Sequence, residues 1–167
     1  MFNLYEDSRN DTFRQLACDN LLCVEYRCLP GDTRNILWSQ YGHLVFVTNG
    51  QKRWITPDGE CYATIGDAVY CNRGACQIEN FHDEAFCALL FFFPIEFIRE
   101  TVLEYQESLN TSVLPPAPEF HVMKMNVDDT LKAFFESVIS YCSQKTNPSK
   151  HILKLKFKEL ILQVLTS

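Results

Sequence analysis

The hydrophobic pattern of the sequence changes its period at Pro94, and this change constrains the fold more than any other feature. Before Pro94, short runs of β-branched and aromatic residues alternate with turn residues such as Asn49-Gly50, a pair that favours a tight hairpin turn. Short strands separated by turns at near-regular spacing are typical of a β-sandwich or barrel. The pattern predicts strands at residues 22–29, 34–40, 43–48, 52–56, 60–65, 68–72, 76–80 and 85–93.

After Pro94 the apolar residues recur every three to four positions, which predicts helices. A first helix is expected from Pro94 to about residue 108, followed by a proline-rich loop at 110–118 and a short apolar run at 120–125. Asn126 is the expected N-cap of a second helix that reaches about residue 144, and a third helix is expected at 149–164. The expected organisation is an N-terminal arm (1–20), a barrel (21–93), a helix with a connecting segment (94–125) and a helical segment (126–167).

Composition limits the class of protein. The chain has 167 residues, of which 47% are apolar and 22% charged, so it has the size and apolar content of one globular domain. Its longest apolar run, residues 85–95, is about half of the ~20 residues that a membrane span needs. No signal peptide is visible in residues 1–10, so we expect a cytoplasmic domain. The net charge of −6 argues against nucleic-acid binding by this chain alone, although residues 143–167 carry +4.

The eight cysteines contain no C-x-x-C pair, and most lie in apolar, strand-like surroundings. We therefore interpret them as free buried thiols, with a redox-sensing thiol and a zinc site as less favoured alternatives. The four histidines are scattered, and no phosphate-binding loop, nucleophile elbow or H-E-x-x-H motif occurs. The sequence thus predicts neither an enzyme nor a cofactor.

Residues 42–94 carry a recognisable order of motifs: Val47-Thr48-Asn49-Gly50, then Ile65-Gly66-Asp67, then Gly74, and finally Phe91-Phe92-Phe93-Pro94. This order resembles a cupin and, more specifically, the N-terminal domain of AraC/XylS-type bacterial transcription regulators. The apolar helix at 153–165 is similar to the helix that precedes the DNA-binding domain of that family. Ala63 departs from the family pattern, which has a bulkier residue there. The resemblance covers roughly residues 20–165.

The resemblance implies a mainly β fold with C-terminal helices, in which a cupin-like (jelly-roll) β-barrel precedes an antiparallel helix pair. It implies an effector-sensing and dimerisation domain, with DNA contacted only through a helix-turn-helix domain outside these residues. Metal-dependent cupin enzymes have an H-x-H pair, whereas this chain has only His43 in that region and Asn72, Arg73, Cys76 and His82 later on. We therefore expect no metal.

The barrel interior is expected to be filled or strongly apolar, because few of its candidate residues are polar. That composition is similar to the AraC-type subset that activates type III secretion genes and is controlled by a binding protein rather than a metabolite. A small-molecule effector remains open. The candidate pocket residues are Trp38, His43, Val45, Val47, Trp54, Cys71, Glu79, Cys87 and Leu89.

The last helix is apolar over more than half of its circumference, which predicts that it packs on its own domain and on a partner. The expected partner is a second copy of the chain, and the helix seam resembles a coiled coil. The candidate dimerisation residues are Leu153, Phe157, Leu160, Ile161 and Val164, whereas Ile152, Leu155 and Leu162 lie off this seam. Two alternatives remain: a free-standing small-molecule-binding or enzymatic cupin, and a protein–protein interaction module.

Overall fold

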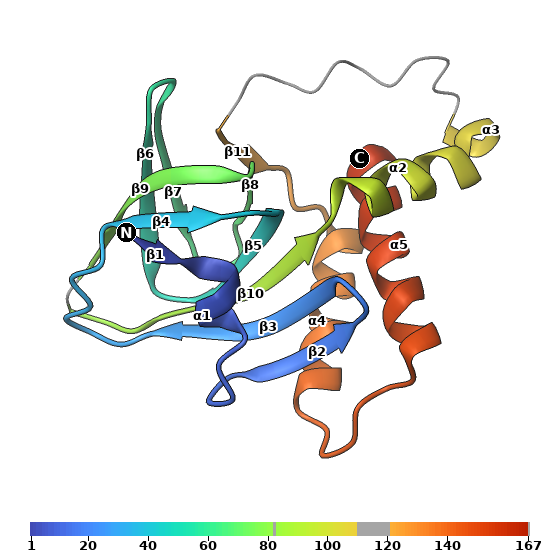
Figure 1. Ribbon diagram of the computed structural model, residues 1–167, viewed down its shortest axis with the longest axis horizontal. Coiled ribbons are helices and arrows are strands. Elements are labelled where there is room, and N and C mark those ends of the chain that lie inside the picture. The colour runs from blue at the N-terminus through green and yellow to red at the C-terminus, as the bar shows by residue number, and fades with distance from the viewer. Residues whose placement is uncertain (82, 110–120, 167) are drawn as a thin grey trace.

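Two facing β-sheets form the body of the structure, and helices pack on the outer side of one of them (Figure 1). The computed structural model describes residues 1–81, 83–109 and 121–166. The helices in these ranges are α1 (Leu4–Ser8), α2 (Ile95–Glu104), α3 (Gln106–Leu109), α4 (Asp129–Cys142) and α5 (Lys150–Thr166). The strands are β1 (Phe2–Asn3), β2 (Arg14–Cys18), β3 (Leu21–Cys28), β4 (Ile36–Ser39), β5 (Gly42–Asn49), β6 (Gln51–Thr56), β7 (Gly59–Thr64), β8 (Ala68–Cys71), β9 (Gly74–Asn80), β10 (Phe86–Phe93) and β11 (Val122–Met125).

The first sheet has the order β1-β4-β9-β6-β7, and the second has the order β11-β8-β5-β10-β3-β2. Neighbouring strands are antiparallel except for the short parallel pair β1 and β4. Figure 1 shows α4 and α5 running in opposite directions beside β10, β3 and β2. The predicted fold class, a cupin-like barrel followed by an antiparallel helix pair, is therefore confirmed.

Alternating side chains of β10 enter two separate hydrophobic cores. Phe86, Ala88, Leu90 and Phe92 point into the barrel, whereas Leu89, Phe91 and Phe93 point towards the helices. The second core is rich in stacked and edge-on aromatic pairs, such as Phe46 on Phe135 at 4.1 Å between ring centroids. A strand that is apolar on both faces is expected where both faces are buried. β10 is therefore the wall that the two cores share.

The predicted hairpin at Asn49-Gly50 is wrong, because β5 and β6 belong to different sheets. Gly50 instead takes the chain from one sheet to the other, with a φ of 73°. A Cβ at this position would lie 2.6 Å from the carbonyl oxygen of Ala85, and the Asn49 side-chain amide donates to that same oxygen at 2.7 Å. Asn-Gly serves here for a close approach to β10 rather than for a two-residue turn. The tight hairpins are β6–β7, whose register ends at Thr56 opposite Gly59, and β2–β3, whose register ends at Cys18 opposite Leu21.

The Gly66-Asp67 turn is hydrogen-bonded directly to the Val47-Thr48-Asn49-Gly50 motif. The Gly66 amide donates to the Val47 carbonyl, and the Val47 amide donates to the Asp67 carbonyl, each at 2.9 Å. Gly66 has a φ of 89°, a conformation that favours glycine. The Asp67 carboxylate accepts from the Thr64 amide at 3.0 Å and pairs with Lys124 of β11 at 2.9 Å. The two sequence motifs are thus joined to each other by a pair of backbone hydrogen bonds.

Several element boundaries differ from those predicted. Asp128, not Asn126, is the N-cap of α4, and its carboxylate accepts from the Leu131 amide at 2.8 Å. The helix expected from Pro94 to residue 108 is divided at Tyr105 into α2 and α3. The predicted loop at 110–118 lies outside the described residues. The segment 1–20, expected as an arm, adds β1 and β2 to the two sheets and places α1 against the barrel.

Candidate functional site

The barrel interior is lined by both sheets and by α1, and it holds two basic side chains among mostly apolar ones. His43 of β5 and Lys52 of β6 are 1% and 5% exposed, respectively. The surrounding apolar residues form one cluster: Leu4, Tyr5, Leu22, Val24, Tyr26, Cys28, Leu37, Val45, Val47, Trp54, Ala63, Val69, Cys71, Ile78, Phe86, Ala88, Leu90 and Phe92. Buried polar groups are costly unless they are paired, so these two residues set the chemistry of the interior.

The Lys52 ammonium has little to compensate for its burial. Its Nζ lies 4.1 Å from the centroid of the Phe86 ring and 3.9 Å from the Cys28 Sγ. Across the described residues, no carboxylate oxygen lies within 4 Å of this nitrogen. Burial therefore lowers the pKa of Lys52, although the thiol of Cys28 and the carboxylate of Asp32 oppose that shift.

His43 faces the same interior. Its Nδ1 lies 3.5 Å from the Tyr41 carbonyl oxygen, and its Nε2 has no hydrogen-bond partner among the described residues. The ring packs at 5.3 Å, centroid to centroid, from the ring of Phe92. Burial lowers the pKa of His43 to about 4, and the charge of Lys52 adds to this effect. The imidazole is therefore neutral near pH 7.

The remaining space inside the barrel is small. The cavity beside these two side chains has a volume of about 10 Å³, which is close to what one water molecule needs. Side chains thus fill the barrel, as its apolar composition suggested. The cavity is lined by Leu4, Tyr26, Leu37, His43, Val45, Lys52, Trp54, Phe86 and Leu90.

The N-terminal segment, residues 2–8, closes this end of the barrel. Leu4 belongs to the cavity wall, and Asp7 accepts a hydrogen bond from the Tyr26 hydroxyl at 2.8 Å. Arg34 pairs with Asp7 at 3.1 Å and with Asp32 at 2.6 Å. Its guanidinium also lies 4.4 Å from the centroid of the Phe2 ring. These polar contacts at the barrel rim hold the segment in place.

Five of the nine candidate pocket residues lie in the interior as predicted, namely His43, Val45, Val47, Trp54 and Cys71. The prediction is wrong for the other four. Trp38 is 36% exposed on the outer face of β4, and Glu79 pairs with Arg53 on the outer face of its sheet. Cys87 and Leu89 lie on the helix side of β10, where Leu89 is fully buried in the second core. Both faces of β10 are apolar, so alternation alone does not tell which one turns inward.

Sequence reasoning missed Lys52. It lies between Gln51 and Arg53 in a run that looks like a polar hairpin arm. A signal was nevertheless present, because Lys52 is two residues from Trp54 and therefore shares its face of the strand. Assigning Trp54 to the interior requires that Lys52 be there too.

The predicted dimerisation seam is wrong in its residues, because it is buried within the chain itself. Leu153, Phe157, Leu160 and Ile161 are 4%, 2%, 0% and 6% exposed. They pack on the aromatic residues of β10 and α4, with Phe157 edge-on to Phe91 and Phe93 at 5.9 and 5.6 Å. Val164 is half-buried at the margin of this core.

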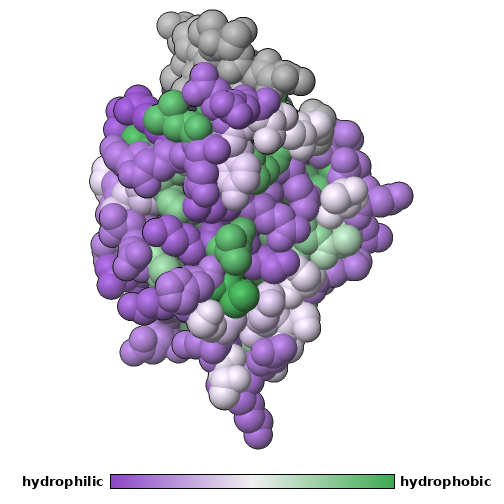
Figure 2. Space-filling model, turned by 90° about the vertical axis from the view of Figure 1, so that its right-hand side faces the viewer, coloured by the Kyte–Doolittle hydropathy of each residue, from purple (hydrophilic) through white to green (hydrophobic). Residues whose placement is uncertain are grey.

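Two of the residues off the seam, Ile152 and Leu155, lie on the exposed side of α5, whereas Leu162 is half-buried. Leu155, Leu165 and Ile152 of α5 are 57%, 47% and 39% exposed, and Leu103 of α2 is 64% exposed. A groove of about 400 Å³ is lined by Tyr105, Leu155, Lys158, Glu159, Leu162, Gln163 and Thr166. We call this surface of α2 and α5 the outer helix face. Figure 2 shows the side of the molecule that carries these helices, where separate hydrophobic patches lie among hydrophilic residues.

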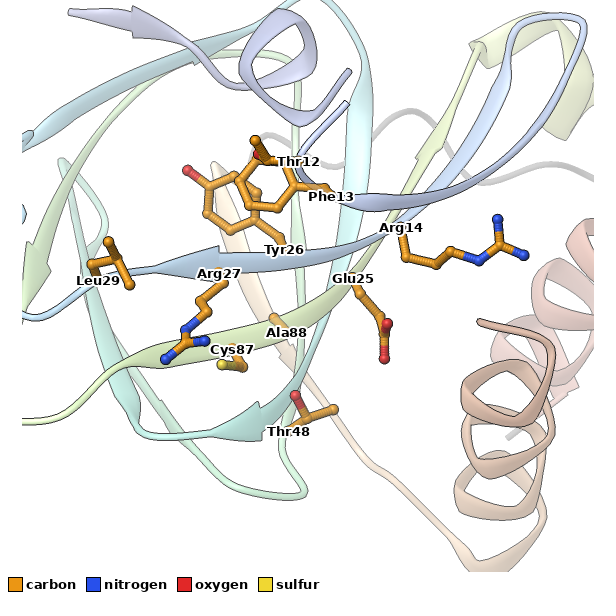
Figure 3. A pocket seen from close by; sticks show the side chains of 10 residues that line it. All are labelled: Thr12, Phe13, Arg14, Glu25, Tyr26, Arg27, Leu29, Thr48, Cys87 and Ala88. Atoms are coloured by element: carbon orange, nitrogen blue, oxygen red, sulfur yellow. The ribbon is translucent and has the colours of Figure 1, made fainter. Parts of the chain in front are cut away.

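A larger open pocket of about 650 Å³ is lined by residues in and beside β2, β3, β5 and β10 of the second sheet (Figure 3). Figure 3 shows the Phe13 and Tyr26 rings on one side of β3 and Glu25 and Arg27 on the other. The pocket is lined by Thr12, Phe13, Arg14, Glu25, Tyr26, Arg27, Leu29, Thr48, Cys87 and Ala88. In contrast to the barrel interior, it holds no buried ionisable side chain without a partner, so it does not favour one class of ligand.

No group of three or more His, Cys, Asp or Glu side chains in the described ranges is placed to hold a metal ion. All eight cysteines are free thiols. None of the helices that the structure describes is both long and apolar enough to cross a membrane.

A sequence profile of the ExsA N-terminal regulatory domain family matches residues 42–167. No curated protein sequence matches the chain. Among solved structures, ToxT from Vibrio cholerae is similar, with 16% identity over 87% of this chain and a TM-score of 0.54. An apo ToxT variant gives 14% identity over 89% and a TM-score of 0.59. ToxT with a bound unsaturated fatty acid is 14% identical over 89% of this chain, with a TM-score of 0.52. The alignments cover 56–57% of ToxT, so this chain spans little more than half of its length, and at these identities the likeness shows the fold.

Proposed function

The chain belongs to the ExsA N-terminal regulatory domain family, within the AraC-type transcription regulators, and on that premise we propose that it controls how an attached helix-turn-helix domain binds DNA. It would do so in the cytoplasm, without a catalytic step, by shifting between conformations that an effector binds with different affinity. Two parts of the structure support this role: the barrel interior around Lys52 and the outer helix face.

The buried ammonium of Lys52 is the observation that carries the proposal. A cation without a carboxylate partner in an apolar interior is destabilising, and a bound anion would offset that cost. We therefore propose an amphipathic monoanion, such as a long-chain carboxylic acid, as the effector. ToxT, which shares the fold, has been solved with a bound unsaturated fatty acid.

Such an effector is much larger than the cavity of about 10 Å³, so its entry requires the barrel wall to move. Few backbone bonds hold the segment 2–8 in the wall, since β1 pairs with β4 over two residues only. We propose that effector binding displaces Leu4 of this segment and brings the carboxylate to Lys52. A conformational change in the domain is then part of binding.

The test compares an unsaturated long-chain fatty acid with its methyl ester in thermal unfolding of the chain. The acid at about 100 times its Kd should raise the Tm by about 5–10 °C, whereas the uncharged ester should not. Lys52→Met should abolish the shift, and Lys132→Met on the exposed side of α4 should retain it. Equal shifts for the wild type and Lys52→Met would refute a role for the Lys52 ammonium.

We further propose a homodimer that forms through the outer helix face. Leu103, Ile152, Leu155 and Leu165 expose apolar surface there that no other residue in the described ranges covers. A two-fold dimer places the same face of both copies in contact, and it would set the spacing of two DNA-binding domains. This proposal keeps the C-terminal helices as the dimer element but uses the side opposite to the predicted seam.

Sedimentation velocity tests this proposal. The wild type should sediment as a dimer at about 50 µM, and Leu155→Asp should give monomers because the new charge would be desolvated in the interface. The Tm of the variant should stay within 2 °C of that of the wild type, since Leu155 is 57% exposed. Leu29→Asp, at a position that is 63% exposed on the barrel, is the matched control and should remain dimeric. A wild-type monomer at this concentration would contradict the proposal.

A further inference from the structure

The hydrogen-bonding groups inside the barrel are unbalanced, and this imbalance limits which ligands fit. Lys52 and His43 line the same cavity of about 10 Å³. Among the described residues, the Lys52 Nζ has one hydrogen-bond contact, the Cys28 Sγ at 3.9 Å, and the His43 Nε2 has none. A buried polar atom without a partner is costly, so a ligand that pairs with both nitrogens gains from each contact.

The Tyr41 carbonyl group fixes the tautomer of His43. The His43 Nδ1 lies 3.5 Å from this carbonyl oxygen, which can accept a hydrogen bond but cannot donate one. Because burial lowers the pKa of His43 to about 4, the ring is neutral at pH 7 and carries a single N–H. That N–H is therefore on Nδ1, where it donates to Tyr41. The other nitrogen, Nε2, has a lone pair and acts as an acceptor.

The two side chains require different groups from a ligand. The Lys52 ammonium has three N–H donors and no acceptor, so it pairs with an anion. A carboxylate beside this cation is ionised, and an ionised carboxylate accepts hydrogen bonds without donating any. It therefore matches Lys52 but leaves the His43 Nε2 without a partner. A hydroxyl group is uncharged and donates one hydrogen bond, which is what Nε2 requires.

We propose that the effector is a hydroxylated fatty acid, whose carboxylate pairs with Lys52 and whose hydroxyl group donates to the His43 Nε2. This inference rests on the effector that we propose for Lys52 and adds a second polar group to it. Both side chains line one cavity about as large as a water molecule, so the two ligand groups must be close together. The hydroxyl group is therefore on C2 or C3 of the acid, and the alkyl chain packs among the apolar residues of the interior.

His43 then determines which acid is preferred, while Lys52 provides the affinity for the anion. The imidazole is held on two sides, by the Tyr41 carbonyl oxygen and by the Phe92 ring at 5.3 Å between centroids. At 1% exposure, the His43 side chain has almost no contact with solvent. A buried acceptor in a fixed position discriminates against ligands that lack the matching donor, because those ligands leave it unpaired.

Titration calorimetry of the wild-type chain at pH 7 tests the role of the hydroxyl group. The acids compared are tetradecanoic acid and its 2-hydroxy, 3-hydroxy and 14-hydroxy derivatives. The 2-hydroxy or the 3-hydroxy acid should bind with a Kd about 10-fold below that of tetradecanoic acid. The 14-hydroxy acid is an isomer of both and is the matched control, and it should bind no more tightly than tetradecanoic acid. Equal Kd values for all four acids would overturn this inference and leave the carboxylate at Lys52 intact.

Two variants separate the roles of the side chains. Lys52→Met should abolish the binding of every acid. His43→Phe keeps an aromatic ring beside Phe92 but removes the acceptor, so it should bind tetradecanoic acid and lose the preference for the hydroxy acid. A preference that persists in His43→Phe would overturn the inference.

A further ligand makes the test independent of whether His43→Phe folds. The ether oxygen of 3-methoxytetradecanoic acid cannot donate a hydrogen bond, so this acid should bind the wild type no more tightly than tetradecanoic acid does. Tighter binding of the methoxy acid would contradict donation to Nε2. If the wild type bound none of these acids, both the effector proposed for Lys52 and the present inference would be refuted.

Discussion

Two basic residues inside the barrel, His43 and Lys52, make the stability of the domain depend on pH. His43 acts below pH 6.5, and Lys52 acts below pH 10.5. Both are bases whose charged form burial disfavours, so the unfolded chain binds each proton more tightly than the folded chain does. Wherever the unfolded state binds more protons, stability rises with pH. The two residues act in separate pH windows, so each can be tested alone.

For His43 the window runs from its ordinary pKa of 6.5 down to about 4. In this range the unfolded chain is protonated and the folded chain is not, so acidification should reduce the free energy of unfolding by up to about 3 kcal/mol. Urea denaturation at pH 7 and pH 4.5 measures the effect. His43→Gln should lose less stability than the wild type between these values, and His151→Gln, exposed on α5, should match the wild type. Parallel pH profiles for the wild type and His43→Gln would contradict the assignment.

For Lys52 the window lies below its ordinary pKa of 10.5. Lys52→Met removes the buried charge and keeps the side-chain volume, so it should raise the free energy of unfolding at pH 7 by about 1–3 kcal/mol. The advantage of the variant should shrink as the pH rises towards 10.5, where the wild-type ammonium loses its proton in both states. Chemical denaturation between pH 7 and 10 checks this, and a variant less stable than the wild type throughout would disprove it.

At the scale of elements, α5 has two sides with different roles, and two leucines separate them. Leu160 is fully buried, so Leu160→Ala should reduce the free energy of unfolding by about 2–5 kcal/mol. Leu155 is 57% exposed, so Leu155→Ala should change it by less than about 0.5 kcal/mol. Urea denaturation of both variants at low protein concentration makes the comparison. Similar losses for the two would mean that α5 does not pack as the structure describes.

The sequence predicted the positions of helices and strands better than it predicted which other elements they pair with or pack against. Strand and helix positions follow from local periodicity, and turn residues such as Gly59 and Gly66 appear where they were expected. Whether Asn49-Gly50 closes a hairpin or crosses between sheets depends on Ala85, which is distant in sequence. The burial of Leu160 likewise depends on β10. A local pattern says that a face is apolar, but not which of two apolar partners covers it.

The whole molecule should unfold in one step, because the barrel core and the helix core both depend on β10. Trp54 is 1% exposed inside the barrel and reports on the first core, provided that Trp38→Phe removes the other tryptophan. Circular dichroism at 222 nm reports on the helices. The urea midpoints from the two probes should coincide within error. Helices that melt at lower urea than the Trp54 signal would show two independent units.

β10 separates the two cores. A conformational change that widens the barrel must therefore also move the side chains of β10 on which α4 and α5 pack. Its side chains alternate between the two compartments, so a shift of one residue along the strand would exchange their contents. A change in the barrel interior is therefore transmitted to the helices through the single strand β10.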